Sequence, residues 1–257
     1  MAAVVPEAST ARSDPPDAPA PAPTRFDEVT ASVLASVVAT GLVVSVADPP
    51  GRLLPEINLV LSPGEVMNLL ASDDPETTAV LRVLAGFDAP KAGSLVVDGE
   101  RRDALDPLER RRREALSTGA LFDAPVLVTE QSVATNLELP LLASGLSPDA
   151  ARALVAGRLA ETGLEALSRH RIDALRDDQI LVVAAVRSLM VSAPLVVVAV
   201  ATIGFSDDTV GFVRSLLDNA RLNGSAVVVV SDDPRLRFPD STLAELAQGR
   251  LLPLVVS

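Results

Sequence analysis

The chain has 257 residues, enough for one large domain or two small ones, and 48% of them are hydrophobic while only 2% are aromatic. Its formal net charge of −12 argues against a nucleic-acid partner, because binding to phosphate backbones needs clustered Lys and Arg. The chain contains no Cys, which excludes disulfides and thiolate sites, and its single histidine, His170, excludes a metal site built from several histidines. We therefore expect a core of Val, Leu and Ala, and no metal site.

The first 28 residues are rich in Ala, Pro, Ser and Asp, and such a segment cannot bury enough apolar surface to order itself. We expect a disordered tail over residues 1–28 and a folded domain over residues 29–257. Two apolar runs, residues 30–47 and 180–205, have the length of a membrane span. The first is rich in β-branched residues and interrupted by Gly41, and the second carries Arg187 and Pro194. Because a charge is costly in lipid, we expect no insertion into a membrane.

The first half of the chain predicts strands followed by a strand–helix unit. Residues 29–62 favour β segments separated by a turn at residues 48–51, and residues 64–71 favour a buried strand. The pattern then predicts a helix over residues 76–86, a strand over residues 94–99 that ends in a turn signal, and a short strand over residues 120–122. Between these strands, residues 107–116 indicate a charged helix, in which the basic run 110–113 is flanked by glutamates and is typical of a solvated face.

The second half alternates between helices and Val-rich strands. Residues 131–165 favour helix, with Ser147 as an N-cap and Pro148 in the first turn. Helices are predicted over residues 178–192 and 207–222, strands over residues 195–201 and 225–231, and a short helix and strand over residues 243–257. Alternating strands and helices imply an α/β fold with a mainly parallel sheet covered on both faces.

The segment between the strand at 64–71 and the helix at 76–86 lies where a phosphate-binding loop would be. The loop motif G-x-x-x-x-G-K-[ST] binds phosphates through backbone N–H groups and a lysine. On that frame Ala71 and Glu76 replace the two glycines, Thr77 replaces the lysine, and only Thr78 keeps a hydroxyl suited to magnesium. The candidate loop therefore consists of Ala71, Ser72, Asp73, Asp74, Pro75, Glu76, Thr77 and Thr78.

Three carboxylates of this loop, on Asp73, Asp74 and Glu76, would lie beside any bound polyphosphate. One carboxylate about 5 Å from one phosphate charge costs on the order of 3 kcal/mol at an effective dielectric constant near 20. The same acids suit the amino end of a helix, where free N–H groups and a partial positive charge favour anions. We interpret them as internal caps that fill the position of a ligand, and we expect Asp177 and Asp178 to do the same for the helix that follows them.

Several other segments occur in a familiar order: Pro63–Glu65, Leu81–Gly99, Gly119–Phe122, Ser132–Leu141, His170–Gln179 and Gln248–Leu251. From about residue 53 onward, the chain resembles the nucleotide-binding subunits of ATP-binding-cassette (ABC) transporters, in the lipoprotein-release and macrolide-export branch. The resemblance implies a P-loop NTPase-like ABC ATPase fold, with a mainly parallel core sheet, an antiparallel β subdomain and an inserted helical subdomain at about residues 125–190.

The positions that carry the chemistry of that family all differ in this chain. The resemblance places the magnesium-binding aspartate at Val200, the catalytic glutamate at Ala201, the Q-loop glutamine at Asp123 and the switch histidine at Asp232. It places the signature motif at Leu175, Arg176, Asp177, Asp178 and Gln179. Since Val200 cannot hold magnesium, Ala201 cannot orient or activate water, and Asp232 has no nearby metal or nucleotide to act on, we expect no catalytic residue, no bound ATP or magnesium, and a chain that is not an enzyme.

The resemblance implies a function through partners. We expect a catalytically degenerate subunit that binds a membrane permease, a homologous ATPase subunit, or both, as a homodimer or heterodimer. It would lie in the cytoplasm at the inner face of the cell membrane. The permease would dock near Phe122–Leu142, where Asn136, Leu137 and Leu139 match the family. Two alternatives remain, an ATP-hydrolysing subunit with non-standard motifs that exports a lipid or hydrophobic substrate, and a regulatory scaffold outside transport.

Overall fold

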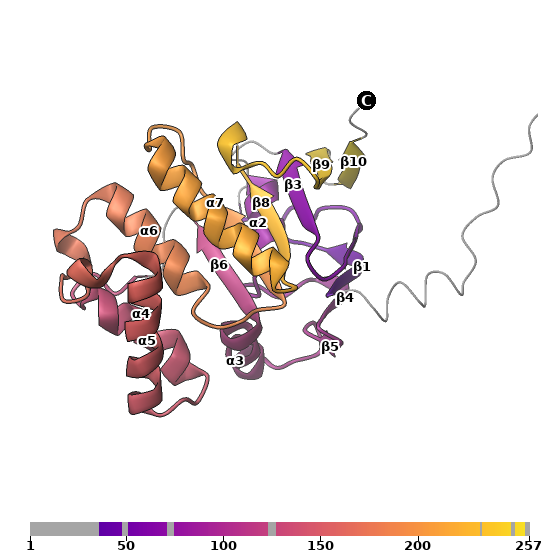
Figure 1. Ribbon diagram of the computed structural model, residues 1–257. Coiled ribbons are helices and arrows are strands. Elements are labelled where there is room, and N and C mark those ends of the chain that lie inside the picture. The colour runs from indigo at the N-terminus through magenta and orange to yellow at the C-terminus, as the bar shows by residue number, and fades with distance from the viewer. Residues whose placement is uncertain are drawn as a thin grey trace, which may run out of the picture.

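The computed structural model describes residues 36–47, 51–70, 75–122, 127–231, 233–247 and 250–254. The tail expected over residues 1–28 lies outside these ranges. Within them the chain forms an α/β fold, in which a mainly parallel sheet is flanked by helices and by a smaller antiparallel sheet (Figure 1). The fold class expected from the sequence is therefore confirmed.

The core sheet has the strand order β10–β9–β3–β8–β7–β6. The strands are β3 (Val66–Leu70), β6 (Thr118–Phe122), β7 (Leu195–Ala199), β8 (Ala226–Val230), β9 (Thr242–Ala247) and β10 (Arg250–Leu254). Strands β9, β3, β8, β7 and β6 are parallel to one another, and β10 closes the edge antiparallel to β9. The continuous Val runs of β7 and β8 form the middle of the sheet because strands buried on both faces need apolar side chains at every position.

Alternate residues of these strands supply two separate cores. Val196 and Val198 pack into one cluster with the helices α6 (Asp177–Ser188) and α7 (Asp207–Leu222). Leu195 and Val197 pack into the other cluster, with the helix α2 (Pro75–Leu84) and the antiparallel sheet. This division follows from the two-residue period of a strand, which sends successive side chains to opposite faces.

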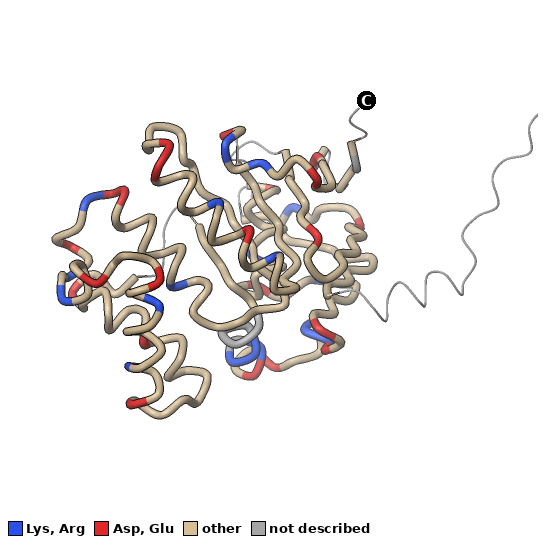
Figure 2. The backbone as a smooth tube through the Cα atoms, in the orientation of Figure 1, with Lys and Arg blue, Asp and Glu red and all other residues tan. Residues whose placement is uncertain are grey.

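The antiparallel sheet has the order β2–β1–β4–β5 and covers α2 from outside the core sheet. Its strands are β1 (Val37–Val43), β2 (Ile57–Leu61), β4 (Ala92–Val97) and β5 (Glu100–Arg101). The helix α3 (Pro107–Ser117) then leads into β6. In Figure 2 the basic residues of α3 lie beside acidic ones, as expected for a solvated face, and Arg113 pairs with Glu100 at 3.0 Å.

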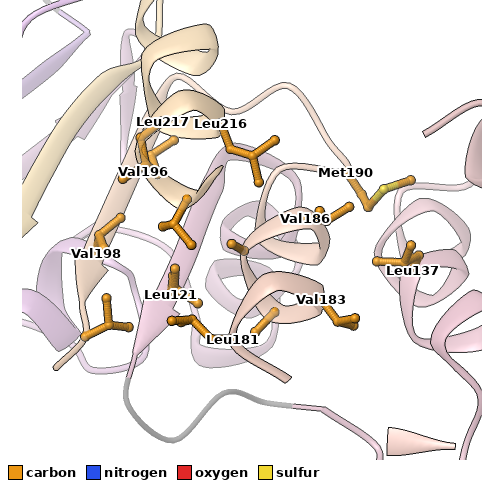
Figure 3. Packing of buried hydrophobic residues seen from close by; sticks show 14 of the residues in the cluster. Leu121, Leu137, Leu181, Val183, Val186, Met190, Val196, Val198, Leu216 and Leu217 are labelled. Atoms are coloured by element: carbon orange, nitrogen blue, oxygen red, sulfur yellow. The ribbon is translucent and has the colours of Figure 1, made fainter. Parts of the chain in front are cut away.

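The helices α4 (Val133–Ala143) and α5 (Pro148–Thr162) form a lobe to one side of the core sheet (Figure 1). Short 3-10 turns, η1 (Glu165–Leu167) and η2 (Ile172–Ala174), lead from α5 to α6, and a third, η3 (Pro234–Leu236), follows β8. Figure 3 shows α6 between the strands and α4, with Leu121 on the sheet side and Leu137 on the α4 side. Among the described residues, no helix is both long and apolar enough to cross a bilayer.

Two predictions of secondary structure need correction. The stretch 131–165 is helical but breaks at residues 144–147, where Gly145 has φ 92° and Ser147 caps α5 as expected. The short helix predicted within residues 243–257 is wrong, because residues 242–247 and 250–254 form the antiparallel strands β9 and β10 instead. Pairing with β3 decides this, since β9 satisfies the backbone groups along the edge of that central strand.

Gly93 is the position where the antiparallel sheet is most sensitive to substitution. It has φ 83°, and a Cβ placed on it would lie 2.2 Å from the carbonyl oxygen of Gly41, at the irregularity of β1. We expect Gly93→Ala to lower the free energy of unfolding by at least about 3 kcal/mol, because it adds a clash with backbone to the cost of a positive φ.

The matched control is Gly99→Ala, since Gly99 has φ 75° but no atom within 4 Å of its added Cβ. It should lose only about 1–2 kcal/mol, the cost of a left-handed conformation. Urea unfolding followed by circular dichroism measures both values, and equal losses in the two variants would refute the close approach at Gly41.

Candidate functional site

The phosphate-loop position lies between the end of β3 at Leu70 and the start of α2 at Pro75. Ala71, Ser72, Asp73 and Asp74 lie outside the described residues, so the structure describes only the second half of this loop. Pro75 and Glu76 occupy the first turn of α2, as expected for a proline and an acid at a helix start.

The two threonines at this helix start differ in exposure. Thr77, which replaces the lysine of the motif, is only 2% exposed, while Thr78 is exposed. A buried side chain cannot reach into a loop that holds phosphates, so Thr77 acts as part of the packing of α2. Thr78 is the one hydroxyl of the pair that faces outward.

Glu76 forms an ion pair with Arg52, a contact that the sequence analysis did not anticipate. Arg52 follows the turn after β1, and its carbonyl oxygen accepts a hydrogen bond from the N–H of Val46 at 2.9 Å. The ion pair therefore joins the connection between β1 and β2 to the amino end of α2. A sequence signal existed, because Arg52 is the only Lys or Arg between residues 26 and 81.

The signature-like segment starts α6 with internal contacts of its own. The backbone N–H of Arg176 donates to Gln179 Oε1 at 3.1 Å, and the Arg176 guanidinium donates to both carboxylate oxygens of Asp178, at 3.0 and 2.9 Å. The hydrogen bonds from Arg176 hold the pKa of the Asp178 carboxyl below its usual range. Asp177 and Asp178 do lie in the first turn, but the side chain that caps the Arg176 N–H is that of Gln179. Leu175, just before them, is half-buried.

The ends of β7 and β8 lie side by side, because these strands are parallel neighbours. Val200 follows β7 and is buried in the core cluster with α6 and α7, and Ala201, next to it, is exposed. Asp232, which follows β8, and Asp123, which follows β6, lie outside the described residues. The structure thus brings Val200 and Ala201 to the expected edge of the sheet.

A buried polar network occupies the same edge, and the sequence analysis did not identify it. Asp233 is 2% exposed and accepts hydrogen bonds from the Thr202 hydroxyl at 2.7 Å and from the Arg235 guanidinium at 2.7–3.1 Å. Its backbone N–H donates to the Ser231 hydroxyl at 3.1 Å. Arg235 first, and Thr202 in addition, hold the pKa of the Asp233 carboxyl well below its usual range. A sequence signal for this network existed, because Asp233 is the second of two acids that directly follow the strand predicted over residues 225–231.

The resemblance to ABC transporter subunits implies a bound magnesium–nucleotide complex. The described residues lack most of the side chains with which the family's motif holds that complex. Val200 carries no oxygen for magnesium, Thr77 is buried, and the Glu76 carboxylate, paired with Arg52, lies at the amino end of α2. The positive end of that helix and the Arg52 guanidinium thus both face a protein carboxylate.

The surface expected to receive a permease also differs in detail. Asn136 is fully buried, and its side chain exchanges hydrogen bonds with the backbone N–H and carbonyl of Val128, at 2.8 and 3.0 Å, and donates to the carbonyl of Ser132. Leu137 is fully buried and Leu139 is half-buried. Asn136 and Leu137 therefore shape this surface from beneath, and Val128, which Asn136 holds in place, is the exposed apolar residue beside them.

Comparison with known proteins gives relatives along most of the chain. No protein-family model matches. The macrolide export ATP-binding/permease protein MacB 1/2 of Paracoccus denitrificans is 28% identical over 203 residues, which are 78% of this chain and 30% of that protein. The lipoprotein-releasing system ATP-binding protein LolD of Bordetella avium is 27% identical over 203 residues, which are 79% of this chain and 88% of that protein. The chain thus spans less than a third of the MacB relative and most of the LolD relative.

A solved structure shows the same fold. The dimeric ATP-binding cassette MJ0796, in a post-hydrolysis state bound to ADP and Pi, matches with a TM-score of 0.72 and 22% identity over 84% of this chain and 96% of that one. The fold is therefore that of an ATP-binding cassette. Together with the relatives, it supports a resemblance of the chain to the nucleotide-binding subunits of ABC transporters, in the branch that contains LolD and MacB.

One expectation from the sequence is corrected by these findings. The chain was expected not to be an enzyme, but its relatives over about four fifths of its length are named as ATP-binding proteins of transport systems. The expectation is wrong because it equated the loss of the family's own side chains with the loss of the activity. Several of the positions on which it relied, including Asp123 and Asp232, also lie outside the described residues.

The polar network at the end of β8 makes Asp233→Asn informative. We expect this variant to lower the free energy of unfolding by about 1–3 kcal/mol at pH 7, because it weakens charge-assisted hydrogen bonds to a buried carboxylate. The pKa of Asp233 is depressed in the folded state, so its stabilising contribution is present above the unfolded-state pKa of about 3.9 and is lost as the pH falls toward the lower folded-state pKa.

The difference in stability between wild type and Asp233→Asn should therefore shrink between pH 6 and pH 3, as measured by urea unfolding across that range. Asp149→Asn is the matched control, because the Asp149 carboxylate pairs with Arg152 while 92% exposed. Its effect should be much smaller at every pH. A constant difference for Asp233→Asn across the range would contradict the buried ion pair.

Proposed function

We propose that the chain is the ATP-binding-cassette subunit of a membrane transporter, that it works by docking on a permease and pairing with a second cassette, and that its own phosphate loop has low affinity for Mg-ATP. The observation that carries the proposal is the pairing of Glu76 with Arg52 at the amino end of α2, within a cassette fold that is otherwise complete along the described residues. The names of the relatives support ATP-driven transport by the assembled transporter.

The permease contact is supported by the way Asn136 orders the start of the helical lobe. Its three hydrogen bonds fix the segment 128–132 against α4, so Val128 is held outward with 42% of its surface exposed. Phe122, which directly precedes the undescribed residues 123–126, is half-buried. The centroid of its ring lies 5.5 Å from that of Phe87, which is 43% exposed. Exposed apolar side chains on a rigid support suit the apolar face of a partner helix.

The low affinity for Mg-ATP is supported by charge. The Glu76 carboxylate stands at the helix start, where a phosphate would otherwise bind, and the Arg52 guanidinium is already engaged by it. A nucleotide would have to displace Glu76 from Arg52 or bind beside a like charge, at a cost of a few kcal/mol by the Coulomb estimate.

The remaining parts of the proposal follow from the relatives. A second cassette, identical or homologous, would complete the assembly, as in the dimeric cassette MJ0796. The subunit would lie in the cytoplasm at the inner face of the cell membrane, beside its permease. A substrate that is lipid-anchored or hydrophobic is proposed from the printed names of LolD and MacB.

The affinity claim is tested by Glu76→Gln. Wild-type protein should bind Mg-ATP only in roughly the millimolar range, and the variant should bind at least about tenfold more tightly, a gain of about 1.4 kcal/mol, because the variant loses the competing charge and frees Arg52. Titration calorimetry measures both affinities. Asp88→Asn is the matched control, since Asp88 pairs with Arg82 just beyond the other end of the same helix and carries the same charge. Micromolar binding by wild type, or an equal gain in the control, would contradict the proposal.

The docking claim is tested by Val128→Asp. Full-length tagged chain is used to isolate detergent-solubilised membrane proteins from its own organism, and mass spectrometry identifies them. Wild type should retain a multi-span permease, and Val128→Asp should lose at least about nine tenths of it, because a charge then faces an apolar contact. Leu222→Asp is the control, as Leu222 is 68% exposed at the end of α7. A permease that binds all three proteins equally, or none of them, would argue against this surface.

A further inference from the structure

The segment between β7 and α7, residues 202–207, has little in its own composition to hold it in one conformation. Ile203 is 66% exposed, Gly204 has φ 103°, and the side chain of Asp207 is 91% exposed. Such a connection would ordinarily be among the less stable parts of a fold, because few of its side chains are buried. It nevertheless lies at the carboxyl edge of the central strands, next to the candidate site.

Arg235 reaches this segment from η3 and binds it at several points. Its guanidinium donates to the carbonyl of Phe205 at 3.2 Å, to the carbonyl of Thr202 at 3.3 Å and to the carboxylate of Asp207 at 2.5 Å. Two of these acceptors are backbone groups near the middle and the start of the segment. A single side chain therefore spans nearly the whole connection.

The Arg235 guanidinium is itself held in place by Asp233. Asp233, which is buried, accepts from both Nε and Nη2 of Arg235, and also from the backbone N–H of Arg235 at 2.9 Å. The hydroxyl of Thr202 donates to the same carboxylate at 2.7 Å, so Asp233 and Arg235, which follow β8, both bind the start of the segment. A planar group with fixed donors that is anchored on one side can define the position of the acceptors on its other side.

We infer that Arg235 is a positioning residue, which fixes the segment 202–207 in one conformation in the protein without any ligand. The cation bridges the ends of β7 and β8, and the segment is ordered by contacts inside the chain. Ile203 is thereby presented to solvent on a rigid support. This inference does not depend on the proposed function, because it concerns the isolated chain and its order.

The Phe205 amide is a direct reporter of this order. Its N–H donates at 3.1 Å to the carbonyl of Thr202, which also accepts from Arg235. The Thr209 amide, a few residues on, is protected separately, because it donates to the capping hydroxyl of Ser206 at 3.2 Å. Loss of Arg235 should therefore expose the first amide and leave the second protected.

Hydrogen exchange on the full chain, followed by mass spectrometry or NMR, tests the inference. In Arg235→Gln the Phe205 amide should exchange at least tenfold faster than in wild type, while Thr209 and the core amides of β7 and β8 change less than twofold. Asp207→Asn removes only the contact on the segment side and should give a smaller acceleration at Phe205. Arg221→Gln is the matched control, since Arg221 pairs with Asp218 on α7, and it should leave Phe205 unchanged.

Two results would overturn the inference. The first is an unchanged exchange rate at Phe205 in both Arg235→Gln and Asp207→Asn. The second is an acceleration at Phe205 that the core amides of β7 and β8 share to the same extent in both variants, because the segment would then follow global unfolding. Since Asp207→Asn leaves the Arg235–Asp233 pair intact, it keeps the test decisive if Arg235→Gln folds poorly.

Discussion

The burial of the Val-rich strands β7 and β8 on both faces is the constraint on which the rest of this structure depends. Val196 and Val198 face one layer of helices, and Leu195 and Val197 face α2 and the antiparallel sheet. Because the strands are parallel and in register, their carboxyl ends meet at one edge. Val200, Thr202 and Asp233 are attached to that edge, and Glu76 lies at the amino end of α2.

At this edge and at the starts of α2 and α6, charges of the chain pair with one another. Arg52 pairs with Glu76, Arg176 with Asp178, and Arg235 with both Asp233 and Asp207. Asp233 is buried and requires such a partner, and a helix start favours an anion whether it comes from a ligand or from the chain. The fold therefore keeps internal ion pairs at the starts of two helices and at the carboxyl edge of the central strands.

The strands and most helices were predictable because the patterns are local. The Val runs indicated buried strands, and Ser147 marked the start of α5 correctly. The hairpin β9–β10 was not predictable, since its pairing partner, β3, lies about 175 residues earlier in the chain. The same limit applies to the site. Arg52 and Arg235 are ordinary surface-type residues in the sequence, and their roles arise only when the fold brings each of them to a carboxylate.

The most direct test of this account is an experimental structure of the full chain determined in the presence of a non-hydrolysable Mg-ATP analogue at roughly 50 micromolar, well below the millimolar dissociation constant proposed for the wild type. We expect the Arg52–Glu76 and Arg235–Asp233 pairs to persist, with no nucleotide at the amino end of α2. A magnesium–nucleotide bound at Pro75–Thr78, with Glu76 displaced from Arg52, would contradict it.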